Sequence, residues 1–170
     1  MKYLYTGILV LILTAMGAAN AETTDLGTIK RLAAEGKGEI AIEKLNERIM
    51  ANQQDVQARF LKAVLSLERG DTNTARALFM EISQQFPQLP EPYNNLAALY
   101  ARDGDYEKAR QALLDAVTGA PDYPVVRANL GDLYVNLAVD AYRRAVELNP
   151  QDQASQAKLR LLEKMFAASN

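Results

Sequence analysis

The side chains that most enzymes use for catalysis are scarce in this chain. Its 170 residues include no cysteine and no histidine. The lack of cysteine excludes disulfides, thiol nucleophiles and iron–sulfur ligation. The lack of histidine removes the commonest general base and the commonest zinc ligand. Any chemistry would therefore have to come from carboxylates, tyrosines or lysines.

Two groups of acidic residues are the remaining candidates for a reactive or metal-binding site. Asp103-Gly104-Asp105 resembles part of a calcium loop, but the further ligands and the closing bidentate Glu of an EF-hand do not follow. Glu39, Glu43 and Glu47 lie four residues apart and are interleaved with Lys44, which is typical of a solvated helix face. We therefore predict no catalytic residue, no metal site and no cofactor, and a protein that is not an enzyme.

Composition narrows the class of protein further. Apolar residues make up 49% of the chain and charged residues 24%, which predicts a packed core rather than disorder. The net charge is −2 and the pI is near 5.3. This balance excludes the basic surface of a nucleic-acid-binding protein.

The first 21 residues have the pattern of an export signal. Lys2 supplies a short positive region, residues 4–15 are nearly all apolar, and Ala19-Asn20-Ala21 supplies the small residues that a signal peptidase reads. Cleavage after Ala21, or a few residues to either side, would leave Glu22 as the new N-terminus. We therefore expect a periplasmic or secreted bacterial protein that has no stable membrane insertion after cleavage. The alternative is an uncleaved anchor, although the apolar run is short for a span of roughly 20 residues.

An interval of 34 residues organises the rest of the chain. Gly36, Gly70 and Gly104 recur at this interval, between apolar stretches with helical periodicity. Six further recurrences at the same interval are Ala41 with Ala75, Ala75 with Ala109, Ala63 with Ala97, Asp71 with Asp105, Arg76 with Arg110, and Pro87 with Pro121. Lys62 departs from the pattern, because Leu96 stands at its place in the next unit. The interval predicts a series of helix pairs joined by glycine turns.

The clearest unit, residues 90–123, closely resembles a tetratricopeptide repeat. The residues that carry the resemblance are Tyr93, Leu96, Ala97, Tyr100, Gly104-Asp105-Tyr106, Ala109, Leu113, Ala116 and Pro121. The resemblance is to exported bacterial members of this family. It implies an all-α fold, a right-handed α-solenoid of helix pairs.

The resemblance divides the chain into successive units. Residues 1–21 are the signal peptide, 22–55 a degenerate repeat, 56–89 and 90–123 full repeats, 124–150 a shortened unit, and 151–170 a C-terminal capping helix. The degenerate first repeat has Arg48 where Ile82 and Ala116 stand in the next two, and it lacks a terminal proline.

The fourth unit is five residues short, and the missing residues are the Gly-Asp-Tyr turn itself. Nothing between Asp132 and Leu148 breaks a helix, so we predict one continuous helix over 125–148, roughly 36 Å long at 1.5 Å per residue. The alternative is a tight turn near Asn136.

A last helix is predicted from Asp152 to about Ala168. Leu159, Leu162 and Phe166 give it an apolar stripe, with which it would cover the end of the array and residues such as Tyr142 of the long helix. This favours a monomer. The alternative is a homodimer formed through the long helix.

Binding in a concave groove, lined by the first helix of each repeat, is the function that the resemblance implies. The positions carried over are Phe60, Val64, Leu67, Asn94, Asn95, Ala98, Arg102, Ala128, Asn129 and Asp132. For Phe60, Val64 and Leu67 the alternative role is packing between repeats. The basic residues of a carboxylate-clamping groove are absent from the matching places, which excludes that subtype.

The sequence thus predicts a non-catalytic module that binds a protein or peptide partner, and no nucleic acid. The leading hypothesis is an adaptor or scaffold in an envelope complex. A second is a structural subunit that self-associates through its C-terminal helices. A third, which no residue supports directly, is an accessory factor of a cell-wall or exopolysaccharide enzyme.

Overall fold

The computed structural model describes residues 24–167, which form eight α-helices and no strand. The predicted export signal lies outside the described residues. The helices are α1 (Leu26–Ala34), α2 (Gly38–Ala51), α3 (Val56–Glu68), α4 (Thr72–Gln85), α5 (Pro90–Arg102), α6 (Tyr106–Gly119), α7 (Pro124–Leu148) and α8 (Gln153–Ala167). None of these helices is both long enough and apolar enough to cross a bilayer.

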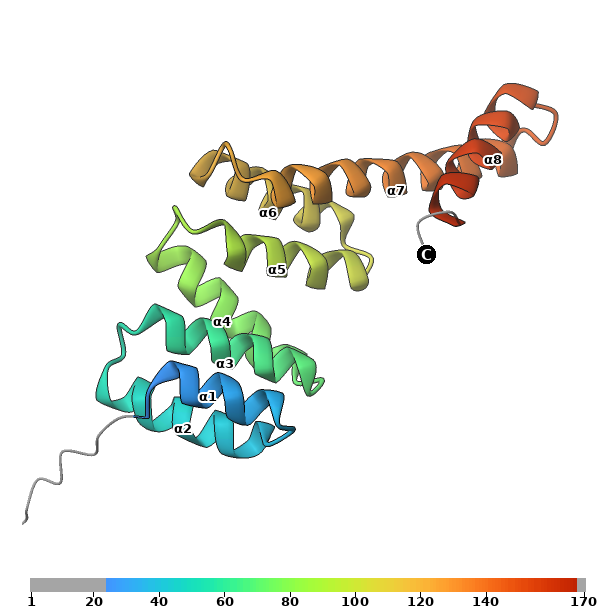
Figure 1. The fold of residues 1–170 in the computed structure, drawn as a ribbon. Coiled ribbons are helices and arrows are strands. Elements are labelled where there is room, and N and C mark those ends of the chain that lie inside the picture. Colours follow the sequence, from blue (N-terminus) through green and yellow to red (C-terminus); the bar gives the residue numbers. More distant parts are fainter. Residues whose placement is uncertain (1–23, 168–170) are drawn as a thin grey trace, which may run out of the picture.

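The helices stack as an α-solenoid, which confirms the predicted fold class (Figure 1). α1 pairs with α2, α3 with α4 and α5 with α6, and each pair packs on the next. The C-terminal half of α7 extends beyond α5 and α6, and α8 lies at its far end (Figure 1). One apolar core runs from α3 to α7, and a smaller one joins α1, α2 and α3.

The three recurring glycines are the turns within the helix pairs. Gly36, Gly70 and Gly104 have φ of 76°, 83° and 80°, in the left-handed region that favours glycine. At the third turn the amide of Asp105 donates to the Tyr100 carbonyl at 2.9 Å, which closes the end of α5. The 34-residue interval therefore marks the positions where the backbone must adopt a positive φ.

Small residues set the distance between paired helices. Ala97 of α5 is 3% exposed and Ala109 of α6 is fully buried, on the faces by which these two helices pack. Phe79 of α4 is also fully buried, and its ring meets that of Phe60 edge to face with 5.5 Å between the ring centroids. Paired helices are therefore close at the alanines, and in the pair of α3 and α4 larger rings fill the space between the helices.

Aspartates cap five of the described helices, and acid is expected to weaken four of these caps. Hydrogen bonds lower the carboxyl pKa in each case: from Thr28 and Gly27 to Asp25, from Thr74 to Asp71, from Lys108 to Asp105, and from Ser155 and Ala154 to Asp152. A lowered folded-state pKa adds stability above the ordinary value of 3.8, and this stability is lost as the pH falls through the folded-state pKa.

We therefore expect the melting temperature to fall as the pH drops below about 4 and through the lowered pKa values of these carboxyls. The variant Asp71→Asn keeps a capping oxygen but cannot titrate, so its melting temperature should depend less on pH. Circular dichroism melts at several pH values would measure the difference. Identical pH dependence in the two proteins would contradict a role for this cap.

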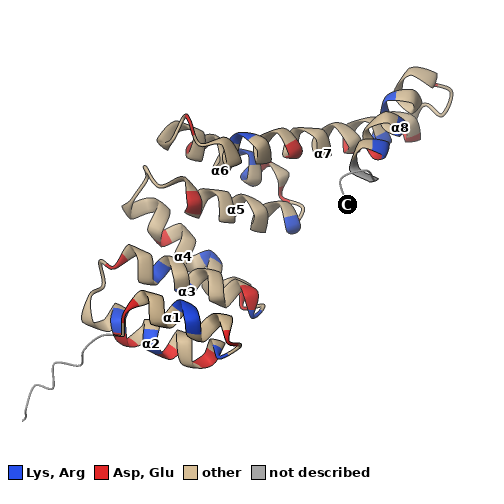
Figure 2. Ribbon diagram, in the orientation of Figure 1, with Lys and Arg blue, Asp and Glu red and all other residues tan. Residues whose placement is uncertain are grey.

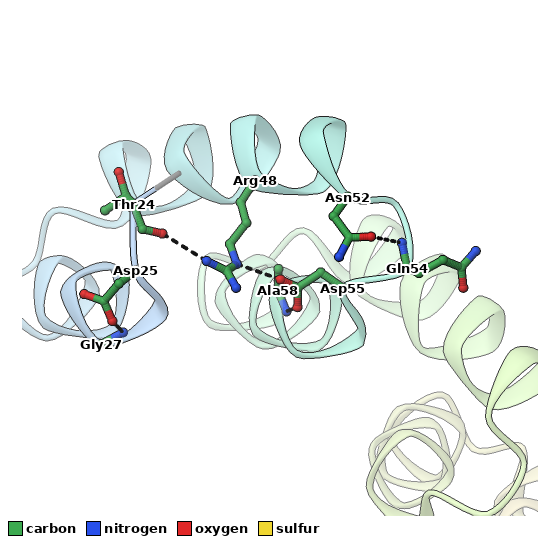
Figure 3. A network of polar contacts seen from close by, with 8 residues as sticks. All are labelled: Thr24, Asp25, Gly27, Arg48, Asn52, Gln54, Asp55 and Ala58. Atoms are coloured by element: carbon green, nitrogen blue, oxygen red, sulfur yellow. Dashed lines mark hydrogen bonds and ion pairs between the residues drawn. The ribbon is translucent and has the colours of Figure 1, made fainter. Parts of the chain in front are cut away.

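In the first repeat Arg48 fixes the end of the helix pair, which a terminal proline does in the later repeats. Its Nε donates to Asp55 Oδ2 at 2.7 Å and its guanidinium lies 3.4 Å from the Thr24 carbonyl (Figure 3). Asp55 in turn caps α3 by accepting from the Ala58 amide at 2.9 Å. The charged side chain therefore fixes the joint between α2 and α3, where a terminal proline is missing.

The fused helix is present as predicted, and the alternative of a turn near Asn136 is wrong. α7 runs without interruption from Pro124 to Leu148. α8 follows within the predicted range and packs on its C-terminal half: Lys158 lies 5.2 Å from the Tyr142 ring centroid, and Arg143 pairs with Glu163 at 3.6 Å. Of the predicted apolar stripe, Leu159 and Leu162 are half-buried, and the side chain of Phe166 lies outside the description.

Candidate functional site: a concave groove

A cavity among the described residues lies along the first helices of the first three repeats. It has a volume of about 550 Å³ and is bounded by α1, α3 and the start of α5. Most of its surface is apolar, with the charged groups Lys30 and Glu91 among its lining residues. The full lining is Leu26, Lys30, Val56, Gln57, Phe60, Leu61, Val64, Leu89, Glu91 and Pro92.

A second, smaller cavity of about 230 Å³ lies between α5 and α7, and residues of α6 form part of its lining. Two asparagines face each other across it: Asn129 donates to Asn94 through Nδ2 and Oδ1 at 2.6 Å. The lining is Asn94, Ala97, Ala98, Ala101, Ala109, Leu113, Asn129, Asp132, Leu133 and Asn136. This part of the groove therefore offers amide and carboxylate groups over a floor of alanines.

Six of the ten residues that the sequence places in the groove line these two cavities. Phe60 and Val64 line the first. Asn94, Ala98, Asn129 and Asp132 line the second. The alternative role also applies to Phe60 and Val64, because both pack against the buried core. They are thus wall residues with one side in the core and the other in the cavity.

The other four predicted residues line neither cavity. Leu67 packs against the core, and Asn95 donates to the Glu91 carbonyl of its own helix at 2.8 Å. Arg102 donates to the Thr72 hydroxyl at 2.9 Å, which ties α5 to α4. Ala128 is exposed and lines neither of the two cavities.

Sequence reasoning missed two lining residues that it could have found. Leu26 and Lys30 of α1 lie 34 residues before Phe60 and Val64, so the same interval predicts them. Leu89 and Pro92 carry no such signal, because they reach the cavity through the way α5 begins beside α3.

The charges around the groove do not favour a strongly acidic or basic ligand. Lys and Arg alternate with Asp and Glu along the helices of the described chain (Figure 2). Residues 24–167 contain no group of three or more acidic side chains that could hold a metal ion. The arrangement offers apolar surface and hydrogen-bonding groups for binding.

These features define a class: an α-solenoid of short helix pairs with an open groove on one face. A family model described as "Tetratricopeptide repeat" matches residues 66–124. Residues 66–124 therefore match the tetratricopeptide-repeat family, as the resemblance predicts. A comparison with curated proteins finds no match.

Solved structures support the same fold. The crystal structure of MamA is 17% identical with a TM-score of 0.59, covering 85% of this chain and 86% of that one. A tetratricopeptide repeat protein from Parabacteroides merdae is 17% identical with a TM-score of 0.60, covering 84% and 59% respectively. The thermophilic protein TTC0263 from Thermus thermophilus is 21% identical with a TM-score of 0.51, covering 81% and 96%. At these identities the likeness concerns the fold.

Proposed function

We propose that this protein is a non-catalytic adaptor or scaffold that binds a peptide segment of a partner protein in the concave groove. The cavity of about 550 Å³ carries this proposal, because it is open, apolar and large enough for several side chains. A short extended segment would place apolar side chains against Phe60 and Val64. Lys30 and Glu91 would then meet polar groups of the same segment.

The second cavity supports a continuous binding site. Asn94 and Asn129 each carry a donor and an acceptor, and a peptide backbone presents the same two kinds of group. The 2.6 Å hydrogen bond between these amides can be exchanged for hydrogen bonds to a ligand backbone. Apolar pockets at one end and amides at the other suit an extended peptide that crosses several repeats.

We also propose that the protein acts in the bacterial envelope. This rests on the pattern of residues 1–21: one lysine, an apolar run and Ala19-Asn20-Ala21. Protein purified from the envelope fraction should have an intact mass that begins at or near Glu22. A mass that retains Met1 in washed membranes would instead indicate the anchor.

The groove is tested by placing a charge in it. With tagged protein in an envelope extract, the variant Val64→Glu should lose the partner that the unaltered protein captures, because an unpaired carboxylate would face apolar surface. Ala77→Glu, an exposed position on α4, is the matched control and should retain the partner. Melting curves check that both variants fold. Equal capture by both folded variants would exclude the groove as the binding site.

A further inference from the structure

One face of α7 lacks the helix that covers the same face of α5. Gly131 and Tyr134 occupy in α7 the places of Ala97 and Tyr100 in α5. Ala97 is 3% exposed, whereas Gly131 is exposed and Tyr134 is 47% exposed. Among the described residues, no atom outside the local helix backbone lies within 4 Å of the point where a Cβ on Gly131 would stand. The Arg110 side chain hydrogen-bonds to Tyr134, but in the described chain the space around Gly131 is open.

The residue types on this face suit the close approach of another helix. A glycine inside a helix is unfavourable relative to alanine, so it needs a reason in packing or function. Among the described residues, nothing packs against the Cβ position of Gly131. In α8 the corresponding place holds Arg160, which is exposed and too large for a close helix crossing. α7 is thus suited to receive a helix, and α8 to end the array.

The segment that matches this face belongs to the same helix. Its residues correspond by position and spacing to those with which α6 covers α5, namely Ala138 to Ala109, Ala141 to Ala112, Tyr142 to Leu113 and Ala145 to Ala116. Ala112 is 6% exposed, but Ala141 is exposed. Residues 138–148 continue α7, so they cannot fold back onto residues 124–136 of their own chain.

We propose that two copies of this chain exchange these segments and form an antiparallel dimer through α7. Residues 138–148 of each copy cover the face around Gly131 of the other. This contact repeats the interface that the chain already makes between α5 and α6. It rests on the geometry of α7 and does not depend on the groove.

The register of this exchange follows from the α5–α6 pair. There Ala97 and Ala109 are the paired small residues, and their counterparts in α7 are Gly131 and Ala138. Antiparallel pairing in this register places residue 127 opposite residue 142, and residue 134 opposite residue 135.

The pairing stays the same when the two copies are interchanged, which is the condition for a closed two-fold dimer. When residue 131 of one copy meets 138 of the other, residue 138 of the first meets 131 of the second. The two-fold axis then passes near Tyr134 and Val135, close to the middle of the 25-residue helix. Two such helices overlap over roughly 30 Å at 1.5 Å per residue.

α8 contacts Tyr142, one residue of the exchanged segment, but it leaves the face around Gly131 open. α8 packs on the C-terminal half of its own α7 through Lys158 and Tyr142 and through Arg143 and Glu163. The sequence favours a monomer because α8 can cover that half. With α8 in place the face around Gly131 is still open, so the exchanged dimer replaces the monomer as our expectation.

The mass in solution is the first test. Light scattering on the chain from Glu22 should give twice the monomer mass at micromolar concentration. Gly131→Arg should raise the dissociation constant at least about tenfold, because it fills the helix crossing. Asn136→Arg places the same charge on another side of α7, where Asn136 lines the groove, and should leave the dimer intact.

Restoring the missing turn is the complementary test. Inserting Arg-Asp-Gly-Asp-Tyr between Val135 and Asn136 recreates the spacing of the third repeat. Residues 138–148 can then fold back onto their own chain, so the insertion variant should be a monomer. An insertion variant that stays a dimer would overturn the exchange.

A disulfide reports the register directly, because the chain contains no cysteine of its own. Gly131→Cys/Ala138→Cys should form an inter-chain disulfide on oxidation, and neither single variant should. Within one helix these two positions are roughly 10 Å apart, beyond disulfide reach. A monomer at every concentration, or a dimer that neither cross-links nor responds to Gly131→Arg, would overturn the proposal.

Discussion

Replacing Phe79 with alanine is expected to lower the free energy of unfolding by about 3–5 kcal/mol. The side chain is fully buried in the core that joins α3, α4 and α5, and its ring packs edge to face on Phe60. Alanine would leave a cavity at the joint between two repeats, which the surrounding helices can fill only in part. Urea unfolding followed by circular dichroism would measure the loss.

The neighbouring residue provides the control. Met80 lies on the same helix and is 40% exposed, so Met80→Ala should cost well under the loss for Phe79→Ala. Equal costs for the two variants would mean that the core is not centred on Phe79. Because each repeat contacts mainly its neighbours, a defect at this joint should weaken both sides of the array.

The second large effect is expected at Gly119, the last residue of α6. A Cβ there would stand 2.6 Å from the Pro87 carbonyl oxygen and 3.3 Å from the Gln88 Cα. Both are backbone atoms, so they cannot move aside as a side chain would. Gly119→Ala should therefore lower the free energy of unfolding by about 1–3 kcal/mol, although alanine favours the helix itself.

Gly131→Ala is the matched control for this substitution. Gly131 is also helical, but no atom outside the local helix backbone lies within 4 Å of its Cβ position in the described chain. Alanine there should be neutral or add up to about 1 kcal/mol through helix propensity. Thermal and urea unfolding of the two variants would compare them. A stabilised Gly119→Ala protein would show that α6 and the loop after α4 are not in close contact.

Local conformational requirements made much of the fold predictable. Gly36, Gly70 and Gly104 must adopt positive φ, and few other residues do so without strain. Their spacing therefore marks the turns. The loss of the fourth turn was also predictable from the sequence, because a segment with no helix-breaking residue continues as one helix.

The repeat interval also predicts part of the groove. Ala98 and Asp132, which are 34 residues apart, line one cavity because equivalent positions on parallel helices face the same side. Asn94 and Asn129 line it too, but they are 35 residues apart, and only the structure shows that they meet. Leu26 and Lys30 follow from the same rule and were missed only because the first repeat is degenerate.

Contacts between residues without a shared interval were decided by the tertiary structure. Arg48 departs from the repeat pattern, and its role is visible only where its guanidinium reaches Asp55 and the Thr24 carbonyl. Gly119 has no turn to make, yet the Pro87 carbonyl stands where its Cβ would be. Such requirements arise from how two helices approach in space, and the types of neighbouring residues do not encode that distance.

The inference about the uncovered face of α7 needs both the sequence and the tertiary structure. The sequence by itself determined that a helix-covering segment follows Gly131 without a turn. Only the tertiary structure established that no other part of residues 24–167 takes its place, and that α8 packs elsewhere on the same helix. The physical reason is that a sequence fixes which residues can bury one another, whereas the path of the backbone decides whether they meet within one chain.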